Sequence, residues 1–286
     1  MKLGVFTVSA PEYYPLELMD KLSGIGYNGL EWRVTNDKGD RSKPSFWAGN
    51  RAGMTADELL EAADSLVQKA KKLNFEMPSI ASYINCFDLE DVEKHFKAAK
   101  AIGAKNVRIC PAMYDPEKSF NLQVAKTRYY YAMVAQLAAE YGLRACIETH
   151  MNYITPSMSK TMAILEGLDP KYVGIMWDPA NQICEGLERI EMAMDIAGDY
   201  LAEIHAKNLI MNKTEVDGGI KWQVKSVALD QGQVDWKTLL EFLEKKQYDG
   251  WIFFEDFSTD KSTDEKLVYN YEYFKSLCSG NSGVSS

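Results

Sequence analysis

Short apolar runs of strand length alternate with longer amphipathic stretches over almost the whole chain. Each apolar run is bounded by polar or glycine-containing residues, which is typical of a buried strand. The stretches between them repeat apolar residues at helical spacing. The predicted strands are residues 3–8, 29–34, 77–82, 106–110, 144–148, 172–178, 201–205 and 250–255. The predicted helices include residues 55–73, 89–102, 121–141, 157–168, 186–197 and 235–246.

Eight strand–helix units in a chain of 286 residues predict one α/β domain, a (β/α)8 TIM barrel. Several helices are expected to close with a glycine, in residues 23–27, 101–104, 140–143 and 247–250. A doubly wound open sheet is the alternative, but it usually carries a glycine-rich first turn, and residues 8–12 contain no glycine. We expect the barrel to span residues 1–277 and the polar tail 278–286 to be disordered.

Two connections are longer than a compact barrel needs, and both follow strands. Residues 35–54 follow the second strand, and residues 209–231 follow the seventh, with a hairpin expected at 214–224 around Asp217-Gly218-Gly219. Loops of this length are often lids over a site. A packing insertion or an oligomer contact is an equal alternative, so a homo-oligomer is a further expectation.

Four metal-binding side chains stand at the ends of the last four predicted strands. They are Glu148, Asp178, His205 and Glu255. The carboxyl ends of neighbouring barrel strands converge at one rim, where active sites of this fold form. Three carboxylates and an imidazole at one point would be costly to bury without a cation. The pattern therefore predicts one divalent metal ion, Mn²⁺ or Mg²⁺ by preference for oxygen donors, with Co²⁺ or Zn²⁺ also admitted by the imidazole.

The motifs around these residues resemble the xylose isomerase-like superfamily of sugar phosphate isomerases and epimerases. They are Ile147-Glu148-Thr149-His150, Trp177-Asp178-Pro179-Ala180-Asn181, Ile204-His205-Ala206-Lys207-Asn208, Phe254-Glu255-Asp256 and Gly232-Gln233-Val234-Asp235-Trp236. The resemblance covers most of residues 1–277 and implies a metal site made of the same Glu, Asp, His and Glu. Two positions depart from the ketose 3-epimerase pattern: Asn181 replaces a histidine, and Lys207 is the cation nearest His205, where an arginine is usual.

Seven further residues are expected to bind substrate. His150 and Lys207 share strand parity with Glu148 and His205, so they can face the same pocket. An inward arginine suits a carboxylate, phosphate or hydroxyl group. The expected set is His150, Asn181, Lys207, Glu31, Arg33, Trp47 and Arg51. For each, a structural role is the alternative: a hydrogen-bonded strand-end position for His150, an ion pair for Glu31 with Arg33 and for Lys207, a turn cap for Asn181, a core contact for Trp47 and a solvated position for Arg51.

The expected activity is that of a metal-dependent isomerase or epimerase of a small sugar, sugar phosphate or hydroxy-keto acid. Glu148 and Glu255 are the expected catalytic residues, because one can take a proton from carbon and the other can return it through a metal-stabilised enediolate. Loss of a β-hydroxyl from the same intermediate would instead give a lyase, such as a dehydratase of 3-dehydroshikimate or of a keto-cyclitol. A sugar-binding barrel without activity is disfavoured by the paired carboxylates.

Charge and composition disfavour several other classes of function. The net charge of −9 disfavours a nucleic-acid partner, and with only three histidines it also argues against an endonuclease that holds several zinc ions. No apolar run is long enough to span a membrane, so no membrane partner is expected. The five cysteines form no Cys-x-x-Cys pair and residues 1–8 lead directly into a strand, so we expect a cytoplasmic location.

Overall fold

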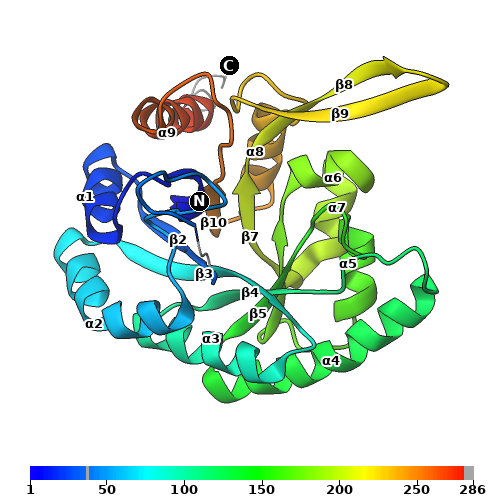
Figure 1. The fold of residues 1–286 in the computed structure, drawn as a ribbon, viewed down its shortest axis with the longest axis horizontal. Helices are drawn as coiled ribbons and strands as arrows, with labels where there is room; N and C mark the ends of the chain where they lie inside the picture. Colours follow the sequence, from blue (N-terminus) through cyan, green and yellow to red (C-terminus); the bar gives the residue numbers. More distant parts are fainter. Residues whose placement is uncertain (37–38, 280–286) are drawn as a thin grey trace.

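The computed structural model describes residues 1–36 and 39–279, and its centre is a closed barrel of parallel strands (Figure 1). The strand order is β1-β10-β7-β6-β5-β4-β3-β2, so the first and last barrel strands pair and close the sheet. The barrel strands are β1 (Lys2–Phe6), β2 (Gly29–Val34), β3 (Glu76–Asn85), β4 (Asn106–Cys110), β5 (Arg144–Glu148), β6 (Val173–Trp177), β7 (Leu201–Ala206) and β10 (Trp251–Phe254). The predicted (β/α)8 barrel is confirmed.

Helices surround the barrel and connect its strands. They are α1 (Pro15–Ile25), α2 (Ala56–Leu73), α3 (Leu89–Ile102), α4 (Phe120–Tyr141), α5 (Met158–Leu165), α6 (Pro179–Glu185), α7 (Ile190–Ala197), α8 (Trp236–Lys245) and α9 (Thr263–Ser279). Short 3-10 turns occupy Thr7–Ser9 and Gly198–Tyr200. In α2, Leu59, Ala63 and Leu66 are buried, and Thr55 and Glu58 cap its first turn reciprocally. The predicted helix at 186–197 begins only at Ile190, because residues 186–189 form a non-helical connection from the separate short helix α6, which ends at Glu185.

Three of the four expected glycine helix ends are confirmed, and one is wrong. Gly26, Gly103 and Gly142 adopt the left-handed conformation after α1, α3 and α4. After α8 it is Gln247 that has a positive φ, of 57°. Gly250 instead meets the ring of Tyr248, since a Cβ added there would lie 2.5 Å from Tyr248 Cζ. The glycine is therefore required for close packing.

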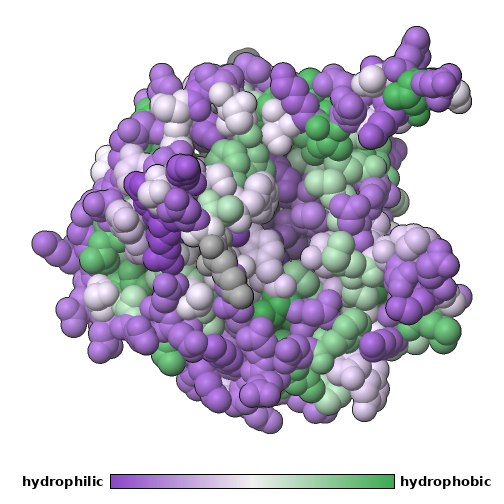
Figure 2. Space-filling model, in the orientation of Figure 1, coloured by the Kyte–Doolittle hydropathy of each residue, from purple (hydrophilic) through white to green (hydrophobic). Residues whose placement is uncertain are grey.

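The second long connection forms a hairpin that projects from the barrel (Figure 1). Strands β8 (Asn208–Val216) and β9 (Gly219–Val227) pair antiparallel over their whole length and turn at Asp217-Gly218, so the expected hairpin is confirmed but is longer than 214–224. Its side chains Ile220, Trp222 and Val224 are exposed, and Figure 2 shows hydrophobic surface on this projection.

The predicted boundary between the barrel and its tail, at residue 278, lies inside the last helix. Helix α9 runs to Ser279, so residues 278 and 279 belong to the last helix, while residues 280–286 lie outside the described residues. Residues 37–38 of the first long loop also lie outside them. No helix among the described residues is long and apolar enough to cross a membrane.

Every second residue of each barrel strand points into the interior of the barrel, and these side chains fill it. An apolar cluster of Phe6, Val8, Ala81, Trp251 and Phe253 lies inside, with the rings of Trp251 and Phe253 stacked 5.3 Å apart. A much larger cluster lies between the strands and the helices. The interior also holds buried polar side chains, among them Glu31, Ser79, Arg108, Glu203 and His205. These polar side chains lead directly to the rim where the candidate site lies.

We predict that Gly29→Ala destabilises the protein, because its Cβ would lie 2.4 Å from the backbone oxygen of Glu76 in the neighbouring strand. Overpacking of this kind costs about 1–3 kcal/mol of unfolding free energy. Gly24→Ala is the matched control: nothing lies within 4 Å of the added Cβ, and alanine favours the helix there. Urea denaturation of both variants measures the difference. Equal stability of the two variants would contradict this account of the strand contact.

Candidate metal and substrate site

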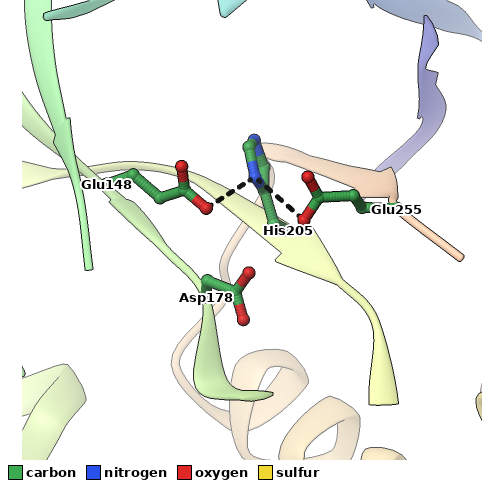
Figure 3. Close-up of side chains that lie close together, drawn as sticks. All are labelled: Glu148, Asp178, His205 and Glu255. Atoms are coloured by element: carbon green, nitrogen blue, oxygen red, sulfur yellow. Dashed lines mark ion pairs between the residues drawn. The ribbon is translucent and has the colours of Figure 1, made fainter. Parts of the chain in front are cut away.

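Four side chains that can ligate a metal converge at the rim of the barrel. Glu148 ends β5, Asp178 follows β6 and caps α6, His205 lies in β7, and Glu255 follows β10. Each offers one ligand atom, and these atoms all lie within 4.8 Å of one another. Figure 3 shows Glu148 and Glu255 approaching His205 from opposite sides, with Asp178 directed toward the same point. The structure thus brings the four predicted ligands together.

The chemistry of this group suits a divalent cation. His205 Nδ1 lies 3.5 Å from Glu148 Oε1 and 3.9 Å from Glu255 Oε2. All four residues are buried, and Nδ1 has no hydrogen-bond partner among the described residues. Three buried carboxylates need compensating positive charge, and an imidazole nitrogen with carboxylate oxygens is a common donor set for Mn²⁺ or Zn²⁺. The residues present therefore fit a metal ion.

Lys207 is part of the same cluster, as strand parity predicts. Its ammonium lies 2.7 Å from Asp178 Oδ2 and 2.9 Å from Glu255 Oε2. Burial would lower the pKa of Lys207, but the two carboxylates raise it well above its ordinary value. Burial also raises the pKa of Glu255, and the charge on Glu148 adds to this rise while Lys207 opposes it. Lys207 therefore supplies a fixed positive charge beside two of the predicted ligands.

Arg108, which was not among the predicted site residues, lies on the neighbouring strand β4 and forms a buried ion pair with Glu148. Burial would raise the pKa of Glu148, but Arg108 and His205 hold it well below its ordinary value. The guanidinium lies 4.4 Å from the centre of the Tyr83 ring, and its Nη2 has no hydrogen-bond partner among the described residues. A sequence signal existed: Asn106 and Arg108 alternate within a short apolar strand, so both point into the barrel.

Asn181 connects two of the predicted ligands. Its Nδ2 donates to Asp178 Oδ2 at 2.9 Å and to Glu148 Oε1 at 3.1 Å, while its backbone N–H donates to Asp178 Oδ1. These bonds fix the carboxylates in position. Asn181 Oδ1 has no partner among the described residues, so its expected role in substrate binding stays a prediction.

A cavity of about 400 Å³ reaches the candidate metal site at Glu255, and its size suits a small-molecule ligand. Charged and polar groups line its inner part: Glu255, Lys207, Arg108 and His150. Trp47 and Phe257 line its outer part, with ring centres 4.9 Å apart. A recess is visible near the middle of the face in Figure 2. His150, Lys207 and Trp47 thus lie where substrate-binding residues were expected.

The structure corrects two of the expected substrate contacts. Arg51 lies away from the cavity, because its loop folds back so that its guanidinium donates to the backbone oxygens of Arg41 and Glu12. Glu31 is fully buried below the site: its Oε1 accepts from Ser79, and its Oε2 lies 2.9 Å from His205 Nε2. A substrate in the cavity meets neither of them.

Arg33, expected beside Glu31, turns upward to the rim. It donates to the backbone oxygen of Trp47 at 3.2 Å, and its guanidinium lies 5.4 Å from the centre of the Tyr83 ring. Since Trp47 and Tyr83 both line the cavity, a substrate role for Arg33 stays a prediction.

We predict that Arg108→Met lowers the unfolding free energy by about 3–5 kcal/mol, because it leaves the buried carboxylate of Glu148 without its partner. Arg41→Met, which breaks an exposed pair with Glu58, is the control and should cost far less. Urea denaturation of both variants is the measurement. A loss for Arg108→Met no larger than that of the control would show that the ion pair with Glu148 does not stabilise the fold.

We also predict that metal affinity rises with pH. Burial would lower the pKa of His205, but Glu31 and Glu148 raise it well above its ordinary value, so a metal must displace a proton from the ring. Affinity should therefore increase by up to about tenfold per pH unit below that raised pKa. Calorimetric titration with Mn²⁺ from about pH 6 to about pH 8, in buffers of different ionisation enthalpy, measures the affinity and the proton release. Affinity independent of pH would contradict a histidine ligand.

Comparison with known proteins agrees with this fold. Residues 19–277 match the family model described as xylose isomerase-like TIM barrel. An inosose dehydratase of Mesomycoplasma hyopneumoniae (strain 7448) is 24% identical over an alignment of 237 residues, which covers 73% of this chain and 77% of that protein. The 3-keto-D-glucoside 4-epimerase YcjR from E. coli superposes with a TM-score of 0.70 at 15% identity, over 96% of this chain and 99% of its own. The IOLI protein with a bound zinc atom superposes with a TM-score of 0.75 at 15% identity, over 99% of this chain and 100% of its own. The chain belongs to the xylose isomerase-like TIM barrel family.

Proposed function

We propose that this protein is a divalent-metal-dependent isomerase or epimerase that acts on a small sugar, sugar phosphate or hydroxy-keto acid. The observation that supports the proposal is that Glu148 and Glu255 approach His205 from opposite sides, and that Glu255 also lines the cavity (Figure 3). Two carboxylates that flank a substrate carbon can remove a proton on one side and return one on the other. A site that only binds a sugar does not need this pair.

The metal ion would be held by the four convergent side chains, Glu148, Asp178, His205 and Glu255. When bound, a divalent ion supplies a Lewis acid for neighbouring carbonyl and hydroxyl oxygens of the substrate. Mn²⁺ or Mg²⁺ is our first proposal because three of the four donors are carboxylates, and the imidazole also admits Zn²⁺ or Co²⁺.

The other residues of the cavity bind and orient the substrate in this proposal. Lys207 and Arg108 place positive charge at the inner end, where they can hold a substrate oxygen that gains negative charge. His150 faces the same space and can donate to or accept from a hydroxyl group. Trp47 and Phe257 offer an apolar surface to the carbon skeleton and exclude water from the outer part of the cavity.

Dehydration of a keto-cyclitol or of 3-dehydroshikimate is the second candidate. The matched relative named above is an inosose dehydratase, and Asn181 stands where the ketose 3-epimerases carry a histidine. The first step would be the same, because a β-hydroxyl leaves only after a proton is taken from the carbon next to the carbonyl. Lys207 or His150 could then give a proton to the departing oxygen.

The test is a screen of ketoses, aldoses, inososes and hydroxy-keto acids with Mn²⁺ in deuterated water. We expect the converted substrate to gain deuterium at the carbon next to its carbonyl, as followed by NMR. An isomer or epimer of unchanged mass, apart from deuterium, supports the first candidate. A product that has lost water and gained an ultraviolet chromophore supports the second.

Variants of the two carboxylates sharpen this test. Glu148→Gln and Glu255→Gln should each lower the exchange rate by about 10²–10⁴-fold, the usual contribution of a positioned acid or base. Glu76→Gln, at an exposed position on β3 paired with Lys2, is the control and should keep the parent rate. Turnover with full retention of the carbon-bound hydrogen would contradict proton transfer. Unchanged rates in both site variants would rule out the catalytic pair.

A further inference from the structure

His205 presents its two ring nitrogens to two different groups of residues. Nδ1 faces the metal-binding side, 3.5 Å from Glu148 and 3.9 Å from Glu255. Nε2 points inward and lies 2.9 Å from Glu31 Oε2. Both His205 and Glu31 lack exposed surface, so bulk solvent does not reach either side chain. The orientation of the ring therefore depends on its protein neighbours.

The carboxylate of Glu31 is itself held by an inner polar layer, which we define as Glu31, Ser79, Asn106 and Glu203. Ser79 Oγ lies 2.9 Å from Glu31 Oε1 and 2.8 Å from Glu203 Oε1. Asn106 Nδ2 donates to Glu203 Oε2 at 2.8 Å. These residues come from β2, β3, β4 and β7, so the layer spans half of the barrel strands. Glu31 Oε2 is left directed at the histidine, and it has no hydrogen-bond partner elsewhere among the described residues.

The chemistry of a histidine ligand explains why a carboxylate stands there. A metal on Nδ1 needs the lone pair of that nitrogen, so the ring hydrogen must sit on Nε2. A buried N–H needs an acceptor, and a carboxylate is the strongest one available in proteins. Histidine ligands usually donate their second N–H in this way, which fixes the tautomer and raises the basicity of the ligating nitrogen.

We propose that Glu31 is a positioning residue that fixes His205 with its hydrogen on Nε2 and its lone pair toward the metal. This inference rests on the proposed function, because it assumes that Glu148, Asp178, His205 and Glu255 bind a metal. Glu31 contacts neither substrate nor metal in this account. The Phe6 ring, 5.5 Å from the imidazole, packs beside the same histidine and limits its rotation.

The proposal is tested by zinc affinity in the full-length protein, measured by competition with a chromogenic chelator. Glu31→Ala removes the acceptor, and Glu31→Gln keeps the size but replaces the charge with an amide. We expect both variants to bind zinc about 10–100-fold more weakly than the parent, the usual effect of losing such a partner. Thermal melting of the zinc-free proteins shows whether each variant is folded, and Glu31→Gln serves if Glu31→Ala is not.

Glu203→Gln is the matched control, because it changes a buried glutamate of the same inner polar layer. The new amide can still meet Ser79 and Asn106. Glu203 comes within 4.8 Å of Glu31 and His205, but no hydrogen bond joins it to either of them among the described residues. We expect its zinc affinity to equal that of the parent. Equal weakening in all three variants would overturn the proposal, since it would show a general effect of the layer on folding.

A spectroscopic measurement separates positioning from a merely structural role. The chain has three histidines, so NMR of the zinc-loaded protein with ¹⁵N-labelled histidine can identify His205. We expect zinc on Nδ1 and a slowly exchanging hydrogen on Nε2, with faster exchange in Glu31→Gln. Zinc on Nε2, or parent-like affinity in both folded Glu31 variants, would overturn this inference alone. If the parent binds no zinc, Mn²⁺ or Mg²⁺, the proposed function fails and the inference falls with it.

Discussion

The arrangement of this barrel is governed by the electrostatic repulsion of carboxylates that it gathers at one end. Glu148, Asp178 and Glu255 are all buried within a few ångströms of His205. In a medium of low dielectric, three such charges can coexist only where positive charge and hydrogen bonds surround them. Arg108 pairs with Glu148, and Lys207 lies between Asp178 and Glu255. A divalent ion at the same point would add to the compensation that these two residues already provide.

Strand parity places all of these groups. Glu203, His205 and Lys207 alternate on β7 and its continuation, and they face the inner polar layer, the metal ligands and the cavity in turn. The same alternation places Glu31 below the site and Arg33 at the rim. The polar side chains of the barrel are therefore arranged in successive levels along its axis. The carboxylate of Glu31, at the lower level, orients His205 above it. His205 in turn lies beneath the part of the cavity that Trp47 and Phe257 line.

Much of this could be predicted from the sequence, because parallel barrel strands are short apolar runs whose ends are sharply marked. The bounds of β2, β4 and β5 match the prediction, and the four candidate ligands were identified because each lies at or next to the end of such a run. Arg108 was missed because it lies inside a strand, where only pairing across the sheet reveals its partner on β5. Glu31 and Arg51 were misplaced for a related reason: the depth of a residue in the barrel and the path of a long loop depend on tertiary contacts. Gly250 was assigned to a helix end, although its role is to make room for Tyr248.

We infer that the four convergent side chains hold one divalent ion. The decisive experiment is a crystal structure of the protein grown with Mn²⁺, with data collected on both sides of the manganese absorption edge. We expect one strong anomalous peak within coordination distance of Glu148, Asp178, His205 Nδ1 and Glu255. A map with no such peak, while manganese is bound elsewhere or not at all, would rule out this site.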